Sequence, residues 1–192
     1  MATAAIPQTP AETKKMNAFV DGLLKKMTLE EKLGQLNLPA GGDLSTGDPL
    51  GKDIVQLAAS GQIGGTFNIK GAEKFHSLQK AAVEKTRLGI PLLFGMDVIH
   101  GYETIFPIPL GLSCSWDLDA IEQSAQIAAR EATAGGVNWT FSPMVDIARD
   151  PRWGRVAEGS GEDPYLGSQI ARAMIRGYQG DLTSDDQLAA CV

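Results

Sequence analysis

The sequence predicts an α/β fold built on a parallel sheet. From residue 62 onward, segments with strand character alternate with segments of helical periodicity. Each helical segment is long enough to connect two parallel neighbouring strands. The chain has 192 residues, 43% of them hydrophobic, which is enough for one sizeable core. Alternation alone fits either an open sheet or a barrel.

Two helices and a loop are predicted near the amino terminus. Apolar residues recur at helical spacing over residues 17–27. Thr28 is followed three residues later by Glu31, a capping box that predicts the start of a second helix. The Gly-, Pro- and Asp-rich stretch 39–51 predicts a loop, and residues 53–60 predict a short helix.

The remaining elements follow the strand-helix rhythm. Strands are predicted over 62–69, 91–96 and 137–147 and from 187 onward, and helices over 72–86, 118–134 and 163–179. Asp117 is placed to cap its helix, the pair Gly135-Gly136 to end it, and Pro143 to interrupt the third strand. Asp163 is placed to cap the last helix.

The two ends of the sequence carry separate expectations. Residues 1–15 lack the basic start and apolar core of a signal peptide, so they are interpreted as a flexible N-terminal lead-in to a domain over 16–192. What remains after a signal has been cut off and a start Met added fits these residues equally well. Three strands and the start of a fourth cannot close an eight-stranded barrel, and the sequence stops within the apolar run LAACV. We therefore expect this to be the front part of a longer polypeptide.

Composition argues against several function classes. A net charge of −6 disfavours broad nucleic-acid binding, and no apolar stretch is long enough to predict a membrane span. Cys114 and Cys191 are isolated and predict buried free thiols rather than a disulfide or zinc site. Two histidines disfavour a His-rich metal site, and the Gly pairs form no nucleotide-binding motif, which gives nucleotide binding weak support.

A charged residue directly follows the predicted strand over 91–96. Asp97 comes after an apolar run and must be solvated, paired or used by the protein. In parallel α/β folds, functional residues gather where strands end. His100 lies in the same loop, where a lone histidine is more often a hydrogen-bonding strut than a catalyst. On position alone, Asp97 fits a helix cap as well as a functional residue.

A denser charged segment, MVDIARDPRWGRVAEGSGEDPYLG, follows the next predicted strand. Some of its charges must pair with one another, because unpaired buried charges are costly. Arginine and carboxylate side chains also suit the vicinal hydroxyl groups of a sugar, since one donates and the other accepts hydrogen bonds. Trp153 can offer a flat apolar face to such a sugar. A phosphate ligand is the competing interpretation.

Three blocks together resemble glycoside hydrolase family 3, in its bacterial β-glucosidase group. They are MTLEEKLGQL, FGMDVIHG and NWTFSPMVDIARDPRWGRVAEGSGEDPYLG, in the family's order. The resemblance implies a (β/α)8 TIM-barrel-like domain, of which only the first half is present. It implies that residues 16–192 stop before the catalytic nucleophile and the acid/base carboxylate, so neither is assigned here.

The resemblance also implies an activity and a binding site. The expected activity is that of an exo-acting retaining β-glucosidase releasing terminal non-reducing β-D-glucose. The expected substrates are β-linked glucosides or cello-oligosaccharides, as in cellulose degradation. Asp97 and Arg155 are implied to bind the terminal sugar, and His100, Trp153 and Arg149 are candidates for supporting roles. The missing C-terminal remainder would be the partner that completes the site.

Several alternatives stay open at this point. The chain could belong to a β-xylosidase or a β-N-acetylglucosaminidase of the same family. It could also be a non-catalytic sugar-binding barrel, or a phosphate-binding barrel of metabolism. The resemblance implies no organic cofactor, and a structural metal stays open although no ligand cluster in the sequence supports one. The resemblance favours the periplasm or secretion over the cytoplasm.

Overall fold

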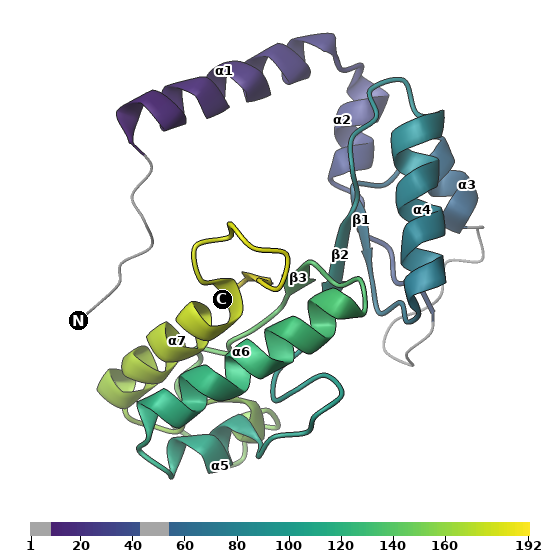
Figure 1. Ribbon diagram of the computed structural model, residues 1–192. Helices are drawn as coiled ribbons and strands as arrows, with labels where there is room; N and C mark the ends of the chain where they lie inside the picture. Colours follow the sequence, from purple (N-terminus) through teal and green to yellow (C-terminus); the bar gives the residue numbers. More distant parts are fainter. Residues whose placement is uncertain (1–8, 43–53) are drawn as a thin grey trace. The chain divides into compact units, whose positions relative to one another are not determined.

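The computed structural model describes residues 9–42 and 54–192, drawn as a ribbon in Figure 1. The chain divides into two compact units, Met1–Leu93 and Phe94–Val192. The parts predicted as a lead-in (residues 1–8) and as a loop (43–51) lie outside the described residues.

The first unit contains four helices and one strand among its described residues. They are α1 (Pro10–Lys26), α2 (Leu29–Gln35), α3 (Ile54–Ala59), β1 (Gly65–Phe67) and α4 (Ala72–Lys85). The predicted capping box of α2 is present: Glu31 N donates to Thr28 Oγ1 and Thr28 N donates to Glu31 Oε2. Of the predicted strand 62–69, only Gly65–Phe67 forms a regular strand.

Helix α1 begins earlier than the predicted start at residue 17. Thr9 and Glu12 form a second capping box, and Pro10 stands at the first helical position, where its missing N–H costs nothing. Residues 10–15 are therefore helical, although the sequence analysis placed them in a flexible lead-in. The signal was the spacing of Thr9 and Glu12, which lies outside the apolar stripe that we used to place the helix.

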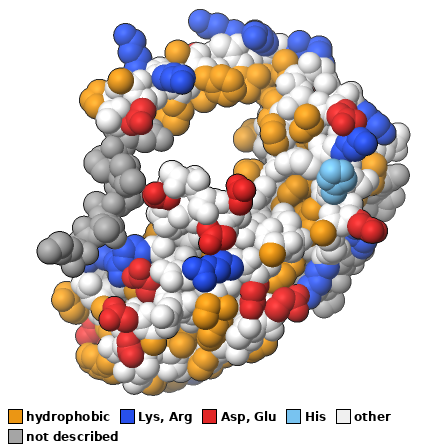
Figure 2. Space-filling view, viewed as in Figure 1, with side chains coloured by type: hydrophobic (Ala, Val, Ile, Leu, Met, Phe, Trp, Pro, Cys, Tyr) orange, Lys and Arg blue, Asp and Glu red, His pale blue; other side chains and the backbone are white. Residues whose placement is uncertain are grey.

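The apolar stripe of α1 is not covered within the first unit. Phe19 is 71% exposed and Met16 and Leu24 are each 45% exposed, and no residue of α1 is buried. Figure 2 shows apolar side chains along one side of this helix and lysines on the other. The core of the unit is formed instead by side chains of α3, α4 and the residues around β1, among them Leu57, Ile63, Phe75, Leu78 and Ala82.

Glycine at position 64 permits α2 to lie close to the chain before β1. A Cβ on Gly64 would stand 2.2 Å from the backbone oxygen of Gln35, which no side-chain movement can relieve. Gly64 O also accepts a hydrogen bond from Leu93 N at 3.0 Å. The Gly64-Gly65 pair is thus explained by backbone packing and needs no phosphate ligand.

The second unit is the parallel α/β part that positions the site. Its elements are β2 (Leu93–Met96), α5 (Pro109–Ser113), α6 (Leu118–Ala134), β3 (Trp139–Thr140), η1 (Val156–Glu158), α7 (Pro164–Gln179) and β4 (Ala189–Ala190). Strand β3 pairs in parallel with β2 and with β4; Trp139 is opposite Gly95 on one side and Ala189 on the other. The predicted α/β class with a parallel sheet is confirmed.

Helix boundaries in this unit agree closely with the prediction. Asp117 Oδ1 accepts from Ala120 N at 3.0 Å, and Asp163 Oδ1 accepts from Tyr165 N and Leu166 N, so both predicted caps are confirmed. Strand β3 is much shorter than the predicted 137–147. Phe141 N still donates to Met96 O at 3.2 Å, but Pro143 has no N–H to continue the ladder.

The prediction of buried cysteines was wrong. Cys114 and Cys191 are free, as predicted, but both are exposed. Cys114 follows α5, a five-residue helix that the sequence analysis missed because it is too short to show periodicity. Cys191 follows β4 and lies beside the cavity described below. Apolar neighbours in sequence do not predict burial where an element ends.

Tyr178 connects α7 to the end of β2. Its side chain is 1% exposed, and its hydroxyl donates to Val98 O at 2.6 Å. Burial raises the pKa of the Tyr178 hydroxyl, so it remains a donor at physiological pH.

We expect Tyr178→Phe to lower the free energy of unfolding by about 1–2 kcal/mol, because Val98 O loses its buried donor. Urea unfolding measures the change. Tyr165→Phe is the matched control, since Tyr165 is 74% exposed, and it should leave the unfolding free energy unchanged. Equal effects of the two substitutions would contradict the role assigned to the buried hydrogen bond.

Candidate functional site

A cavity of about 270 Å³ lies at the carboxyl ends of β2, β3 and β4. Because these strands are parallel, the residues after each one reach the same edge of the sheet. The lining comes from all three strand ends and from the loop that carries η1: Asp97, Phe141, Pro143, Met144, Val145, Asp146, Arg155, Cys191 and Val192. The cavity therefore joins Asp97 and Arg155, the two residues that the family resemblance implied to bind the same sugar.

The backbone around Asp97 is fixed on both sides. Met96 is 5% exposed and Val98 is fully buried. Val98 N lies within hydrogen-bonding distance of Met96 O and of Thr140 Oγ1, at 3.1 and 3.2 Å. Val98 O is held by Tyr178. The strand end thus holds Asp97 at the cavity in one backbone position.

The Asp97 carboxylate has no partner among the described residues. Its side chain is exposed at the cavity, and no described donor reaches its oxygens, so it is neither a helix cap nor half of an ion pair. The Asp97 charge had to be solvated, paired or used by the protein, and pairing is thereby excluded within the described part of the chain. Its acceptor capacity remains available to water or to a ligand.

The electrostatic surroundings raise the pKa of Asp97 above its ordinary value. Partial burial is the main cause, and repulsion from the Glu158 carboxylate adds to it, whereas attraction from Arg155 opposes it. The ionised form is therefore stabilised less here than in water. A carboxylate in this condition gains more from hydroxyl donors than a fully solvated one.

The raised pKa of Asp97 predicts a pH-dependent stability cost. Between the unfolded value of 3.8 and the raised value, the native state binds more protons than the unfolded state, so wild-type stability falls as pH rises through that window. Asp97→Asn removes the titrating carboxyl and with it this pH-dependent loss of stability. We expect the variant to melt at a slightly higher temperature than wild type at pH 7, with the difference vanishing as pH approaches the lower end of the window. Calorimetry at several pH values measures this, and a pH-independent difference would contradict it.

Arg155 reaches the cavity from the residue before η1. Its Nε lies 3.1 Å from both Glu158 carboxylate oxygens, and its Nη2 lies 2.6 Å from Oε2. Nη2 also contacts Met144 Sδ at 3.7 Å. The ion pair raises the pKa of Arg155, and Asp146 and Asp97 contribute to this at longer range. Arg155 is thus permanently charged and held along one edge of its guanidinium.

The three candidate supporting residues do not line the cavity. His100 Nδ1 lies 3.0 Å from Phe106 O, and Phe106 N donates to His100 O, an arrangement that closes the loop after β2. Arg149 and Trp153 lie in the exposed part of the loop after β3. Supporting roles for these residues in sugar binding stay predictions.

Asp146 and Phe141 are lining residues that the sequence analysis did not place in the site. Phe141 meets Trp139 edge to face at a centroid separation of 4.6 Å, and a Cβ on Gly95 would come within 2.7 Å of its ring. The expected salt bridges within the charged loop are present, since Asp150 pairs with Arg152 and Glu158 with Arg155. Asp146 belongs to the same charged loop, and only its closeness to the end of β3 could have distinguished it from the other charged residues there.

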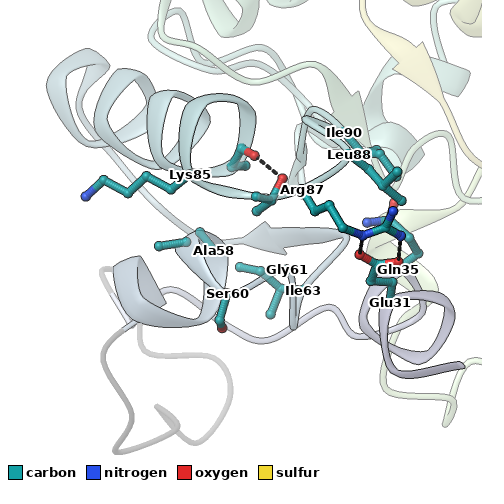
Figure 3. Close-up of a pocket in the computed structure, with 13 residues that line it drawn as sticks. Glu31, Gln35, Ala58, Ser60, Gly61, Ile63, Lys85, Arg87, Leu88 and Ile90 are labelled. Carbon is teal, nitrogen blue, oxygen red and sulfur yellow. Dashed lines mark hydrogen bonds and ion pairs between the residues drawn. The ribbon is translucent and has the colours of Figure 1, made fainter. Parts of the chain in front are cut away.

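A second cavity, of about 280 Å³, lies in the first unit among α2, α3, α4 and the turn that precedes β2 (Figure 3). Arg87 Nε and Nη2 donate to the two oxygens of Glu31 at its rim, at 3.0 and 2.6 Å. The residues that line it precede β1 and β2, at the amino ends of the strands. Since active sites of parallel α/β folds lie at the carboxyl ends, this cavity is not the candidate site.

The described residues contain neither a clustered metal site nor a membrane-spanning helix. No group of three or more His, Cys, Asp or Glu side chains is placed there to hold a metal ion. No helix in residues 9–42 and 54–192 is long and apolar enough to cross a membrane.

Comparisons with known proteins agree on one family. The periplasmic β-glucosidase of Salmonella typhimurium is 42% identical over 92% of this chain and 22% of its own length. The periplasmic β-glucosidase/β-xylosidase of Dickeya chrysanthemi is 31% identical over 82% of this chain and 28% of its own. The crystal structure of a β-glucosidase from Listeria innocua with glucose superposes with a TM-score of 0.80 at 41% identity, over 91% of this chain and 26% of that one.

The chain thus spans about a quarter of the length of these relatives. The family model of the glycosyl hydrolase family 3 N-terminal domain, a (β/α)8-type barrel, matches residues 28–191. That range includes the strand ends that form the cavity. The chain belongs to glycosyl hydrolase family 3, as part of its N-terminal domain.

Proposed function

We propose that this chain supplies the part of the active site that binds the terminal sugar in an exo-acting retaining β-glucosidase. The observation that carries the proposal is the unpaired Asp97 carboxylate beside the Arg155 guanidinium, in a cavity at the carboxyl edge of a family 3 domain. A terminal sugar offers hydroxyl groups that both donate and accept. Asp97 accepts from such groups, and the unoccupied edge of Arg155 donates to them.

The proposed contribution to catalysis is transition-state binding. Retaining hydrolysis requires one carboxylate that attacks and one carboxylic acid that protonates, while the sugar flattens towards an oxocarbenium ion. Contacts from Asp97 and Arg155 speed the reaction to the extent that they strengthen during this flattening. We assign the nucleophile and the acid/base group to residues outside this sequence, so Asp97 and Arg155 are binding residues.

The test is hydrolysis of a panel of chromogenic aryl β-glycosides by the longest product of the gene. We expect the β-glucoside to be cleaved, with release of the β-anomer of glucose seen by NMR before mutarotation. A product that contains family 3 catalytic carboxylates and cleaves no member of the panel would contradict the proposal. It would favour a non-catalytic sugar-binding barrel.

A β-xylosidase activity is the second candidate. The relative from Dickeya chrysanthemi carries both activities in its name. Xylose lacks the hydroxymethyl group of glucose, so the ratio of kcat/KM for the two aryl glycosides decides between them. An aryl N-acetyl-β-glucosaminide in the same panel tests the third family activity.

We propose a periplasmic or secreted location and β-linked glucosides as substrates. Both named relatives are periplasmic by name, and the Listeria enzyme was solved with glucose. Cell fractionation of the source organism tests the location. Comparison of cellobiose with laminaribiose as substrates tests whether cello-oligosaccharides are preferred.

A further inference from the structure

We propose that Glu158 is a positioning residue that holds Arg155 away from Asp97, so that both side chains stay open to a sugar. The inference rests on the proposed function for its effect on sugar binding. Which carboxylate pairs with Arg155 does not depend on that function.

The first step is the local geometry of η1. The short helical turn places Glu158 three residues after Arg155, on the same side of the chain. The Nε and Nη2 edge of the guanidinium faces the Glu158 carboxylate, in a side-on two-point contact. No acceptor in the described part of the chain contacts Nη1, which is left for a ligand.

The second step is competition among carboxylates for one cation. Asp97 and Asp146 line the same cavity as Arg155, and both attract its charge. Neither forms an ion pair with it, because Glu158 occupies the preferred edge of the guanidinium. Arg155 is the only cation among the described lining residues, and neither Asp97 nor Asp146 has an ion-pair partner there. Without Glu158, Arg155 would be free to pair with one of these two carboxylates. A bidentate pair with Asp97 would then consume the acceptor that the sugar needs.

The third step is the effect of Glu158 on the ionisation of Asp97. The titratable groups at this site are Asp97, Asp146, Arg155 and Cys191 around the cavity, with Glu158 behind Arg155. Repulsion from Glu158 raises the pKa of Asp97, and Arg155 lowers it. Removing Glu158 deletes the repulsion and brings Arg155 closer, so both changes lower the pKa of Asp97.

The experiment uses the full gene product and three variants, Glu158→Gln, Glu158→Asp and Asp150→Asn. Asp150→Asn is the matched control, because it breaks a comparable Arg–carboxylate pair in the same loop, away from the cavity. The first measurement is a crystal structure of each ligand-free variant. We expect Arg155 to form an ion pair with Asp97 in Glu158→Gln and to stay in place in the other two.

The second measurement is the Kd for D-glucose as a function of pH, by calorimetry. We expect Glu158→Gln to weaken binding by ~10-fold or more and to move the acid limb of the binding profile to lower pH. Glu158→Asp, which keeps the charge, should recover most of the affinity, and Asp150→Asn should bind as wild type. A role confined to folding would weaken binding without moving the pH limb.

The outcomes separate the two proposals. Arg155 unmoved in the crystal structure of Glu158→Gln overturns the positioning role, whatever the affinity. A wild-type protein that binds no glucose and cleaves no glycoside overturns the proposed function, while the crystal structures still decide how Arg155 is held.

Discussion

Replacing Asp97 by alanine should lower kcat/KM for an aryl β-glucoside by about 150-fold, corresponding to about 3 kcal/mol of transition-state stabilisation. Asp97 is held at the end of β2 by buried neighbours, and its carboxylate has no partner among the described residues. Its loss therefore removes contacts to the sugar and breaks no internal hydrogen bond. Steady-state kinetics of the purified full gene product measures the effect.

The control for Asp97→Ala is stability measured on the same samples. Because burial and Glu158 raise the pKa of Asp97, its charge destabilises the folded state at neutral pH, and its removal should not lower the melting temperature. Loss of activity without loss of stability identifies a binding residue. Near-wild-type kcat/KM would refute the role of Asp97, and a large fall in melting temperature would assign the activity loss to misfolding.

The parallel sheet and the helix boundaries could be predicted because their signals are local. Asp117 and Asp163 cap their helices through hydrogen bonds to residues two or three positions away, so the sequence carries the full information. The parallel arrangement follows from helical crossovers between strands. From these features alone, Asp97 could be placed at the carboxyl edge of the sheet.

The rest depends on contacts between distant segments. Pro143 predicted that the third strand is interrupted, but which residues pair depends on the neighbouring strands: Thr140 is opposite Met96 on one side and Ala190 on the other. Asp97 and Arg155 share a cavity, which the family resemblance implied and which spacing alone could not show. Likewise, only the three-dimensional structure shows that Arg155 forms its ion pair with Glu158 and not with Asp97 or Asp146. Charge clusters in sequence predict that pairs form, but not which charge remains free.

The closest helix packing in the second unit depends on a glycine. Gly177 is buried in α7 where this helix crosses α6. A Cβ at this position would stand 2.4 Å from Glu122 O and 2.6 Å from Ala125 Cβ. Neither atom can rotate away, because one is backbone and the other has no rotamer. We expect Gly177→Ala to force the helices apart and to lower the free energy of unfolding by about 3 kcal/mol.

A matched control lies on the same helix. A Cβ at Gly167 would meet only Ile147 Cδ1, at the ordinary contact distance of 3.7 Å. Gly167→Ala gains helix propensity without a clash, so it should raise the unfolding free energy by about 0.5–1 kcal/mol. The same chemical change is thus expected to act with opposite signs ten residues apart. Urea unfolding of both variants measures this, and a stabilising Gly177→Ala would mean that α6 and α7 do not pack this closely. Because the Tyr178 hydroxyl of α7 holds Val98 O next to Asp97, such looser packing would also leave Asp97 less rigidly held.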